Sequence, residues 1–330
     1  MSNEEKTESN TSNTEKKERK KPAPDGRGVA AICGGFAGAL LVLRCFQMLK
    51  ITDFETGFFT SPKSATVLPM YIIFVLFVLL SVILPRLSSA ALRAKFPEKR
   101  DIVHGAASAL LCAGTVKASL AGFMSFAANV SDSMMTQLEY LKMNKAYSEL
   151  LSPVFALLAA VVLALDAVSA FSGKPVAAKL RLLHLCPAMW LFTVTVKYFG
   201  ITANYLKEPQ FMLLIFATVF FMLFMFEYAR FVCGIAAKSA EKLYVSAGII
   251  SVGLFAALLV PELLAGIFIK DYTGVVNAGF AWWQAAAPVF VLSALRMKLG
   301  DDEKEEPAEA EAEGAENAES AESAESNGRT

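Results

Sequence analysis

The sequence has few of the residues from which catalytic and metal sites are usually built. Its 330 residues include only two histidines, His104 and His184, and five cysteines that all lie inside or at the edges of apolar runs. Neither residue type shows the spacing of a zinc site or of a disulfide framework. His-Glu-x-x-His, Walker and Gly-x-Ser-x-Gly motifs are missing as well. We therefore expect no metal, no cofactor and no identifiable catalytic residue, and both histidines are interpreted as structural.

The chain also lacks an excess of either charge, because 31 basic residues balance 31 acidic ones. This balance neither favours nor excludes an anionic partner, and no nucleic-acid partner is expected. Two polar segments stand apart from the rest by composition. Residues 1–27 are rich in Glu, Lys, Ser and Thr, whereas residues 299–330 carry an acidic Ala/Glu/Ser pattern. Neither segment has an apolar face to bury, so both are predicted to be disordered tails that could also bind a cytoplasmic protein.

Between the tails, the chain consists mainly of long apolar runs. Hydrophobic residues make up 55% of the sequence, and several runs reach the roughly 20 residues that cross a bilayer. Helices satisfy their own backbone over such lengths, so we predict an all-α, multi-pass membrane domain over residues 28–298. Its eight predicted spans are 28–49, 66–85, 103–128, 150–172, 180–201, 210–233, 244–269 and 275–296.

Basic residues alternate between the predicted loops. They are frequent after spans two, four and six, and fewer in the other loops. By the positive-inside rule, the basic loops and both tails face the cytoplasm, which requires an even number of spans. Eight spans meet this requirement. Spans one to four and five to eight are also consistent with a weak 4+4 parallel repeat.

Two features on the predicted outer side call for a local interpretation. Residues 133–143 place Met134, Met135, Leu138 and Leu141 on one helical face, with Ser133 available as an N-cap. This segment is either a short interfacial helix or an extension of a neighbouring span. The Trp282-Trp283 pair, near the outer end of span eight, is predicted to belong to an aromatic belt.

Ionisable residues inside spans are the main functional candidates, because each is costly to place in hydrocarbon. Arg44, Lys117, Lys197 and Glu262 are predicted to converge on an outward-facing cavity, where three cations and one carboxylate would leave room for an anionic solute. The alternative is that Arg44 and Lys197 extend to the headgroups while Lys117 pairs with Glu262.

Asp166 and Glu227 lie closer to the predicted cytoplasmic ends of their spans. Basic loops on that side can neutralise them. We therefore predict a structural role for both carboxylates.

Two similar turns are predicted on the outer side, and they could form the rim of one entrance. Both combine an acidic residue with a Thr-Gly pair, which favours a turn. Their candidate rim residues are Asp53, Glu55, Thr56 and Gly57 after span one, and Asp271, Thr273 and Gly274 after span seven. Chance is the alternative, because Thr-Gly pairs are common in turns.

The stretch from Asp53 to Phe59, Asp-Phe-Glu-Thr-Gly-Phe-Phe, follows the first span directly. In this it resembles uncharacterised multi-pass membrane proteins of clostridia-type Gram-positive bacteria, in which an acidic-x-x-Thr-Gly-Phe-Phe turn follows the first span. The resemblance implies a location in the bacterial plasma membrane and implies no activity.

Three functions remain compatible with the sequence. The first is a small-solute transporter or solute-binding membrane protein, with a small anionic solute as ligand, which the cations in the spans favour. The second is a membrane scaffold or sensor for the cell envelope that acts through its tails. The third is a membrane-embedded lipid-modifying enzyme, which lacks support from an acid/base motif. The sequence leaves the oligomeric state open.

Overall fold

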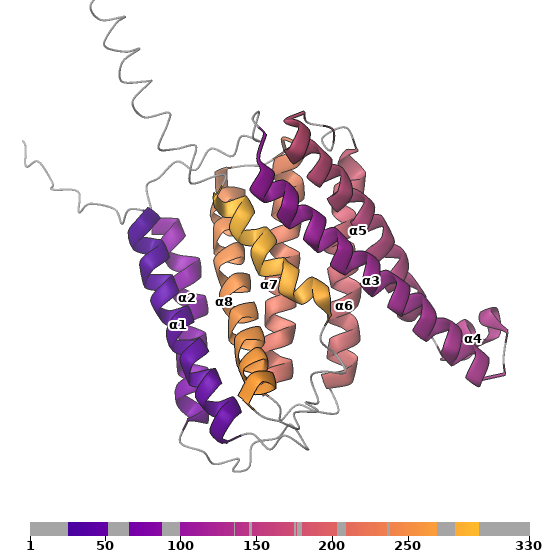
Figure 1. The fold of residues 1–330 in the computed structure, drawn as a ribbon, viewed down its shortest axis with the longest axis horizontal. Coiled ribbons are helices and arrows are strands. Elements are labelled where there is room, and N and C mark those ends of the chain that lie inside the picture. Colours follow the sequence, from indigo (N-terminus) through magenta and orange to yellow (C-terminus); the bar gives the residue numbers. More distant parts are fainter. Residues whose placement is uncertain are drawn as a thin grey trace, which may run out of the picture.

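The structure is a computed structural model, and it describes residues 26–51, 66–87, 100–134, 136–144, 147–174, 176, 180–202, 209–235, 238–268 and 281–296. Every regular element in these ranges is a helix (Figure 1). The predicted all-α fold is therefore confirmed. Apart from residues 26 and 27, which begin the first helix, both predicted tails lie outside the described residues.

The described helices follow closely on one another along the chain. In order they are α1 (Gly26–Lys50), α2 (Val67–Leu87), α3 (Ile102–Asp132), α4 (Gln137–Asn144), α5 (Tyr147–Ser172), the 3-10 helix η2 (Arg181–Leu185), α6 (Cys186–Thr202), α7 (Pro209–Val232), α8 (Lys238–Phe268) and a last helix at 282–296.

Seven of these helices are long and apolar enough to cross a membrane, counting η2 and α6 as one span. They correspond to the first seven predicted spans, which confirms a multi-pass membrane protein. The eighth predicted span, 275–296, is helical from 282 to 296 in the described part of the chain. This length is below the roughly 20 residues needed to cross the hydrocarbon.

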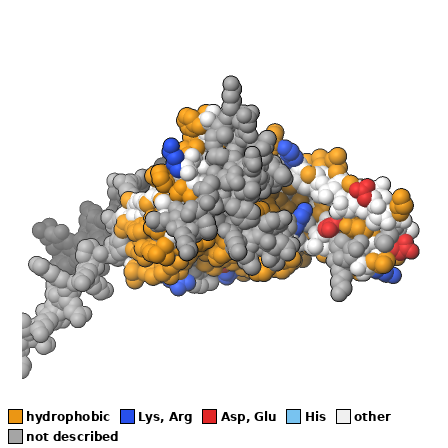
Figure 2. Space-filling view, turned by 90° about the horizontal axis from the view of Figure 1, so that it is seen from below, with side chains coloured by type: hydrophobic (Ala, Val, Ile, Leu, Met, Phe, Trp, Pro, Cys, Tyr) orange, Lys and Arg blue, Asp and Glu red, His pale blue; other side chains and the backbone are white. Residues whose placement is uncertain are grey.

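The helices form one bundle in which consecutive spans run in opposite directions (Figure 1). The α1–α2 pair lies at one edge and packs on α8, while the α3–α5 pair lies at the other edge and packs on α6. α8 is the central helix. In its most apolar stretch 61% of the residues are buried inside the bundle, whereas the corresponding share in α2, at the edge, is 17%. Many large hydrophobic side chains are exposed on the outside of the bundle, among them Leu68, Leu120 and Met124. Hydrophobic atoms are visible along its edge in the end-on view (Figure 2).

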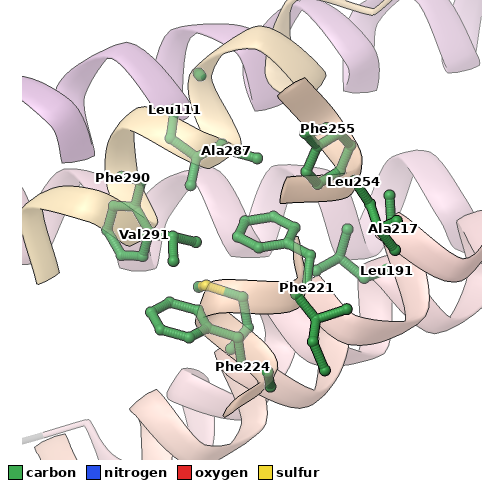
Figure 3. Close-up of a cluster of buried hydrophobic side chains, with 14 of the residues drawn as sticks. Leu111, Leu191, Ala217, Phe221, Phe224, Leu254, Phe255, Ala287, Phe290 and Val291 are labelled. Atoms are coloured by element: carbon green, nitrogen blue, oxygen red, sulfur yellow. The ribbon is translucent and has the colours of Figure 1, made fainter. Parts of the chain in front are cut away.

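Every membrane-spanning helix and the last helix contribute aromatic or aliphatic side chains to the core, and the part drawn in Figure 3 includes residues of α3, α6, α7, α8 and the last helix. Phe224 of α7 stacks on Tyr244 of α8 with ring centroids 4.6 Å apart, and Phe290 meets Phe224 edge-on at 6.4 Å. Lipid is as apolar as these side chains, so close packing rather than removal from water holds such helices together.

The last helix begins beside the middle of its neighbours. Its Trp283 packs against Phe221, halfway along α7, and against Phe255, halfway along α8, with ring centroids 6.4 and 6.0 Å away. Trp283 is consequently 2% exposed. Its predicted place in an interfacial belt is wrong, because the helix starts inside the bundle. Trp282, which points the other way, is 62% exposed.

α3 extends past the bundle, and α4 lies at its far end (Figure 1). The chain breaks between the two helices at Met134, where φ is 54°. The predicted short helix is therefore present, although α3 is also extended to Asp132. The predicted N-cap is wrong: Ser133 instead follows α3 as its C-cap. The Asp and Glu side chains visible in the end-on view gather on this protruding part (Figure 2).

Thr136 caps α4 because Glu139 follows it three residues later, the spacing of a capping box. The Thr136 hydroxyl and backbone N–H donate to Oε2 of Glu139 over 2.7 and 3.1 Å. In return, the N–H of Glu139 donates to the Thr136 hydroxyl oxygen over 3.4 Å. These bonds lower the pKa of Glu139 below its usual value.

The cap predicts a pH dependence confined to α4. Because the pKa of Glu139 is lowered in the folded state, the stabilisation is complete above the ordinary glutamate pKa and is lost as the pH falls through the lowered value. We expect the backbone amide shifts of Thr136 and Glu139 to titrate together below the ordinary glutamate pKa in NMR spectra. Glu139→Gln should remove this titration. A titration at or above the ordinary value would contradict the cap.

Candidate functional site

A polar cluster joins the last turns of α1 and α8 to the first turn of α7. We call it the Arg44 cluster; its members are Arg44, Gln47, Thr66, Gln210 and Glu262. Nη1 of Arg44 donates to Oε1 of Gln47 over 3.1 Å, and Nη2 donates to Oε1 of Gln210 over 3.4 Å. Gln210 in turn donates to Oε1 of Glu262. Gln47 donates to the carbonyl and hydroxyl oxygens of Thr66 over 3.0 and 3.3 Å.

The guanidinium of Arg44 is buried, yet it is not saturated with partners. Arg44 is 2% exposed, and both acceptors that it contacts are neutral amides. Its buried Nε has no hydrogen-bond partner among the described residues. Glu262 supplies an electrostatic counter-charge from the far side of Gln210. A guanidinium offers five N–H donors, so part of its capacity is left for another acceptor.

The four predicted ligand residues are only partly brought together. Arg44 and Glu262 belong to one cluster, whereas Lys117 and Lys197 are both exposed. The ammonium of Lys117 lies 4.0 Å from the ring centroid of Trp282, where it makes a cation–π contact. α1 packs mainly on α2 and α8, whereas Lys117 lies on α3, which packs mainly on α5. The predicted Lys117–Glu262 pair is not among the ion pairs of the described residues.

The two predicted outer-rim turns fall outside the described residues. This applies to Asp53, Glu55, Thr56, Gly57, Asp271, Thr273 and Gly274. Their role as a rim therefore stays a prediction. So does the 4+4 repeat, although Arg44 is buried and Lys197 exposed at positions that the repeat would equate.

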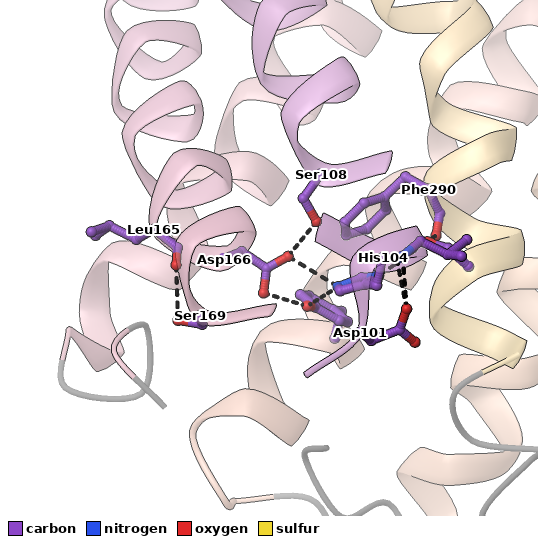
Figure 4. A network of polar contacts seen from close by, with 10 residues as sticks. Asp101, His104, Ser108, Leu165, Asp166, Ser169 and Phe290 are labelled. Atoms are coloured by element: carbon purple, nitrogen blue, oxygen red, sulfur yellow. Dashed lines mark hydrogen bonds and ion pairs between the residues drawn. The ribbon is translucent and has the colours of Figure 1, made fainter. Parts of the chain in front are cut away.

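A second polar group lies at the opposite end of α7 (Figure 4). We call it the His104 network; its members are His104, Ser108, Asp166, Tyr228 and Ser293. Nε2 of His104 lies 3.1 Å from Oδ2 of Asp166 and 3.0 Å from the Tyr228 hydroxyl oxygen. Asp166 accepts two further bonds of 2.7 Å, from the hydroxyls of Ser108 and Tyr228. Nδ1 of His104 lies 3.0 Å from Oγ of Ser293.

The His104 network is buried and positioned by four helices. His104 and Asp166 are each 1% exposed. Asp101 caps the start of α3 by accepting from the backbone N–H groups of Val103 and His104 over 2.9 and 3.1 Å. This cap fixes His104 in the first turn of α3, facing the last turns of α5, α7 and the helix 282–296 (Figure 4).

Asp166, His104 and Ser293 are connected in the order of a hydrolytic triad. Ser293 also has a second partner, because its hydroxyl lies 2.7 Å from the Phe290 carbonyl, to which it can donate. Ser293 is also only 5% exposed, so a substrate has no access to its oxygen in this conformation. The triad order therefore gives no support to a membrane-embedded lipid-modifying enzyme.

Sequence reasoning placed Glu227 correctly and missed the partner of Asp166. Glu227 is neutralised by Arg230, whose Nη1 donates to both carboxylate oxygens over 2.9 and 3.0 Å. Asp166 is paired with His104 rather than with a basic loop. A signal for this pair was present, because His104 begins span three and Asp166 lies near the end of the antiparallel span four. Residues at equal depth in consecutive spans can meet.

The chain matches none of the protein-family models, curated proteins or solved structures with which it was compared.

Proposed function

We propose that this protein binds a small anionic solute at the Arg44 cluster and carries it across the bacterial plasma membrane. The observation that supports the proposal is the buried, incompletely bonded guanidinium of Arg44. An arginine kept inside a membrane domain marks a functional site by default, because its burial is costly. A carboxylate or a tetrahedral oxyanion such as phosphate is the partner to which a planar guanidinium is best matched.

The surrounding residues support reversible binding. Glu262 is separated from Arg44 by the amide of Gln210, so the counter-charge is present without occupying the guanidinium directly. A solute anion that bonds to Arg44 would compete with the amide of Gln210, which bonds to Arg44 at 3.4 Å. A bond of this length lies beyond the usual range, so an anion displaces it at little cost.

The proposed orientation follows the basic loops. With both termini in the cytoplasm, the end of the bundle that carries the Arg44 cluster faces outward and the His104 network faces the cytoplasm. Lys117 and Lys197, both exposed, then belong to the approach to the site or to the membrane interface rather than to the bound solute's first contacts.

A ligand screen tests the proposal. Purified protein is heated in detergent with sulfate, acetate, lactate or succinate, and a ligand present at about 100 times its Kd should add about 2.7 kcal/mol of stability. Arg44→Gln should remove the stabilisation, because it deletes the cation while keeping a polar side chain. The matched control is Lys142→Ala, which removes an exposed cation of α4 and should leave the stabilisation unchanged.

Two further variants show whether the anion contacts Arg44 alone or also the two predicted lysines. Lys117→Ala and Lys197→Ala should each retain the stabilisation if Arg44 alone supplies the cationic contact. Its loss in either lysine variant would show that the predicted four-residue site assembles when the solute binds. Undiminished stabilisation in Arg44→Gln would refute the proposed site altogether.

A further inference from the structure

The distances in the His104 network accommodate two arrangements of hydrogens, which differ in the partner of the Ser293 hydroxyl. In the first arrangement, the Ser293 hydroxyl donates to the Phe290 carbonyl, so its oxygen can only accept from Nδ1 of His104. Tyr228 gives its proton to Oδ1 of Asp166, so its oxygen can likewise only accept from Nε2. In this first arrangement both ring nitrogens donate. A histidine that donates from both nitrogens is an imidazolium cation.

The carboxylate of Asp166 is arranged to remain an anion. It accepts from the hydroxyls of Ser108 and Tyr228 and from Nε2 of His104, and all three groups are donors in this arrangement. The pair in this state contains one proton more than a neutral imidazole beside a carboxylate, and it is electrically neutral overall. This arrangement of donors is the proton-loaded form of the pair.

The network can release that proton with one small movement. If Nδ1 of His104 loses its proton, the Ser293 hydroxyl can rotate away from the Phe290 carbonyl and donate to Nδ1 instead. Nε2 keeps its proton and its bond to Asp166, and Ser108 still donates to the carboxylate. The released proton goes to water, and the pair keeps one negative charge.

We propose that the His104–Asp166 pair is a proton-binding site and that its proton is the coupling ion for the anion bound at the Arg44 cluster. The coupling part rests on the proposed function, while proton binding does not. The two sites contact opposite ends of α7, so a single helix connects them and a shift of α7 would act on both. A proton carried with an anion also cancels the charge that crosses the membrane.

Other ionisable groups near the pair have partners of their own or lie at the surface. Tyr244 of α8 interacts electrostatically with Asp166. Glu227 of α7 is paired with Arg230. Asp101 caps α3, and Arg296, which ends the last helix, is exposed. Among the described residues, His104 is the one basic side chain in hydrogen-bond contact with Asp166. The negative charge of Asp166 is therefore balanced when the His104 ring carries its second proton and unbalanced when the ring loses it.

The chain suits a direct measurement of this proton, because it contains only two histidines. His184 donates from Nδ1 to the Leu180 carbonyl over 2.9 Å, and its buried Nε2 has no partner among the described residues. His184→Gln assigns its signals, so the remaining histidine signals belong to His104. Nitrogen shifts of labelled histidine in the folded protein, recorded from about pH 5 to about pH 8, report the state of His104.

We expect His104 to be an imidazolium at the acidic end of the series and to lose its Nδ1 proton as the pH rises. Ser108→Ala removes a donor from the carboxylate without touching His104, so it should raise the midpoint by about one pH unit. Asp166→Asn removes the anion and should lower the midpoint. A His104 signal that stays neutral or stays unchanged across the series in folded protein overturns the proton site, and Ser108→Ala keeps this test available if Asp166→Asn does not fold.

Coupling is tested separately with sulfate, whose charge is constant over this range. Its affinity should fall as the pH rises through the His104 midpoint, and His104→Gln should abolish this dependence. Arg44-dependent sulfate binding that is independent of pH overturns coupling and leaves the proposed function standing. A titrating His104 in a protein that binds none of the anions tested refutes the proposed function and leaves the proton site standing.

Discussion

Asp166→Asn lowers the free energy of unfolding by about 3–5 kcal/mol, the cost of breaking a buried ion pair. The substitution removes the only anion in hydrogen-bond contact with His104 in the described structure. It also places an amide NH₂ group where Asp166 now accepts bonds from Ser108 and Tyr228 at 2.7 Å. The amide N–H donors then face a hydroxyl that is itself a donor, so at least one buried hydrogen-bonding group loses its partner.

The loss is measured by SDS-induced unfolding in mixed micelles, followed by tryptophan fluorescence. Glu149→Gln is the matched control, because Glu149 also accepts two side-chain bonds, from Asn129 at 3.2 Å and Tyr140 at 3.3 Å, but near the surface. It should cost less than about 1 kcal/mol, as surface polar contacts do. If both variants lost the same free energy of unfolding, the burial of Asp166 would contribute nothing to the stability of the protein.

Gly114→Ala destabilises the junction between α3 and the last helix by about 1–3 kcal/mol, the usual cost of overpacking. A Cβ at Gly114 would lie 2.8 Å from the backbone N and Cα of Trp283. These are main-chain atoms, so no side-chain rotation can relieve the contact, and the two helices must move apart. The same unfolding assay measures the effect.

Gly38→Ala is the control for this substitution. Gly38 is also inside a helix, but a Cβ there has nothing within 4 Å. The change should therefore stabilise α1 by about 0.5–1 kcal/mol through helix propensity alone. If Gly114→Ala were equally favourable, the last helix would not be packed on α3 as the structure describes.

Hydropathy predicted the helices well because it depends on local sequence. The first seven apolar runs are each long enough to exclude other structures, and the described helix bounds follow these runs. The predicted site was only partly assembled because convergence depends on helix rotation, which the low amphipathicity of these spans does not reveal. Arg44 and Lys197 look alike in sequence, yet one faces the core and the other the outside.

Asp166 and Trp283 show two further limits of sequence reasoning. We predicted that cations of the basic loops neutralise Asp166, whereas its partner is His104, which lies at the same depth in the bundle. Trp283 was placed at an interface because its span was assumed to cross the whole bilayer. The structure starts that helix beside the middle of α7 and α8, which no local pattern around Trp283 indicates.

The partners of His104 are synthesised one after another, so the His104 network forms in a fixed order. His104 bonds to residues 62, 124 and 189 positions further along the chain, the last of them in the final helix. During synthesis, His104 and Asp166 enter the bilayer before Tyr228 and Ser293 exist, so the ring first has one partner and gains the others one helix at a time. The network is complete only when the ribosome has delivered Ser293, and a chain released before that point lacks the hydroxyl that lies beside Nδ1 of His104.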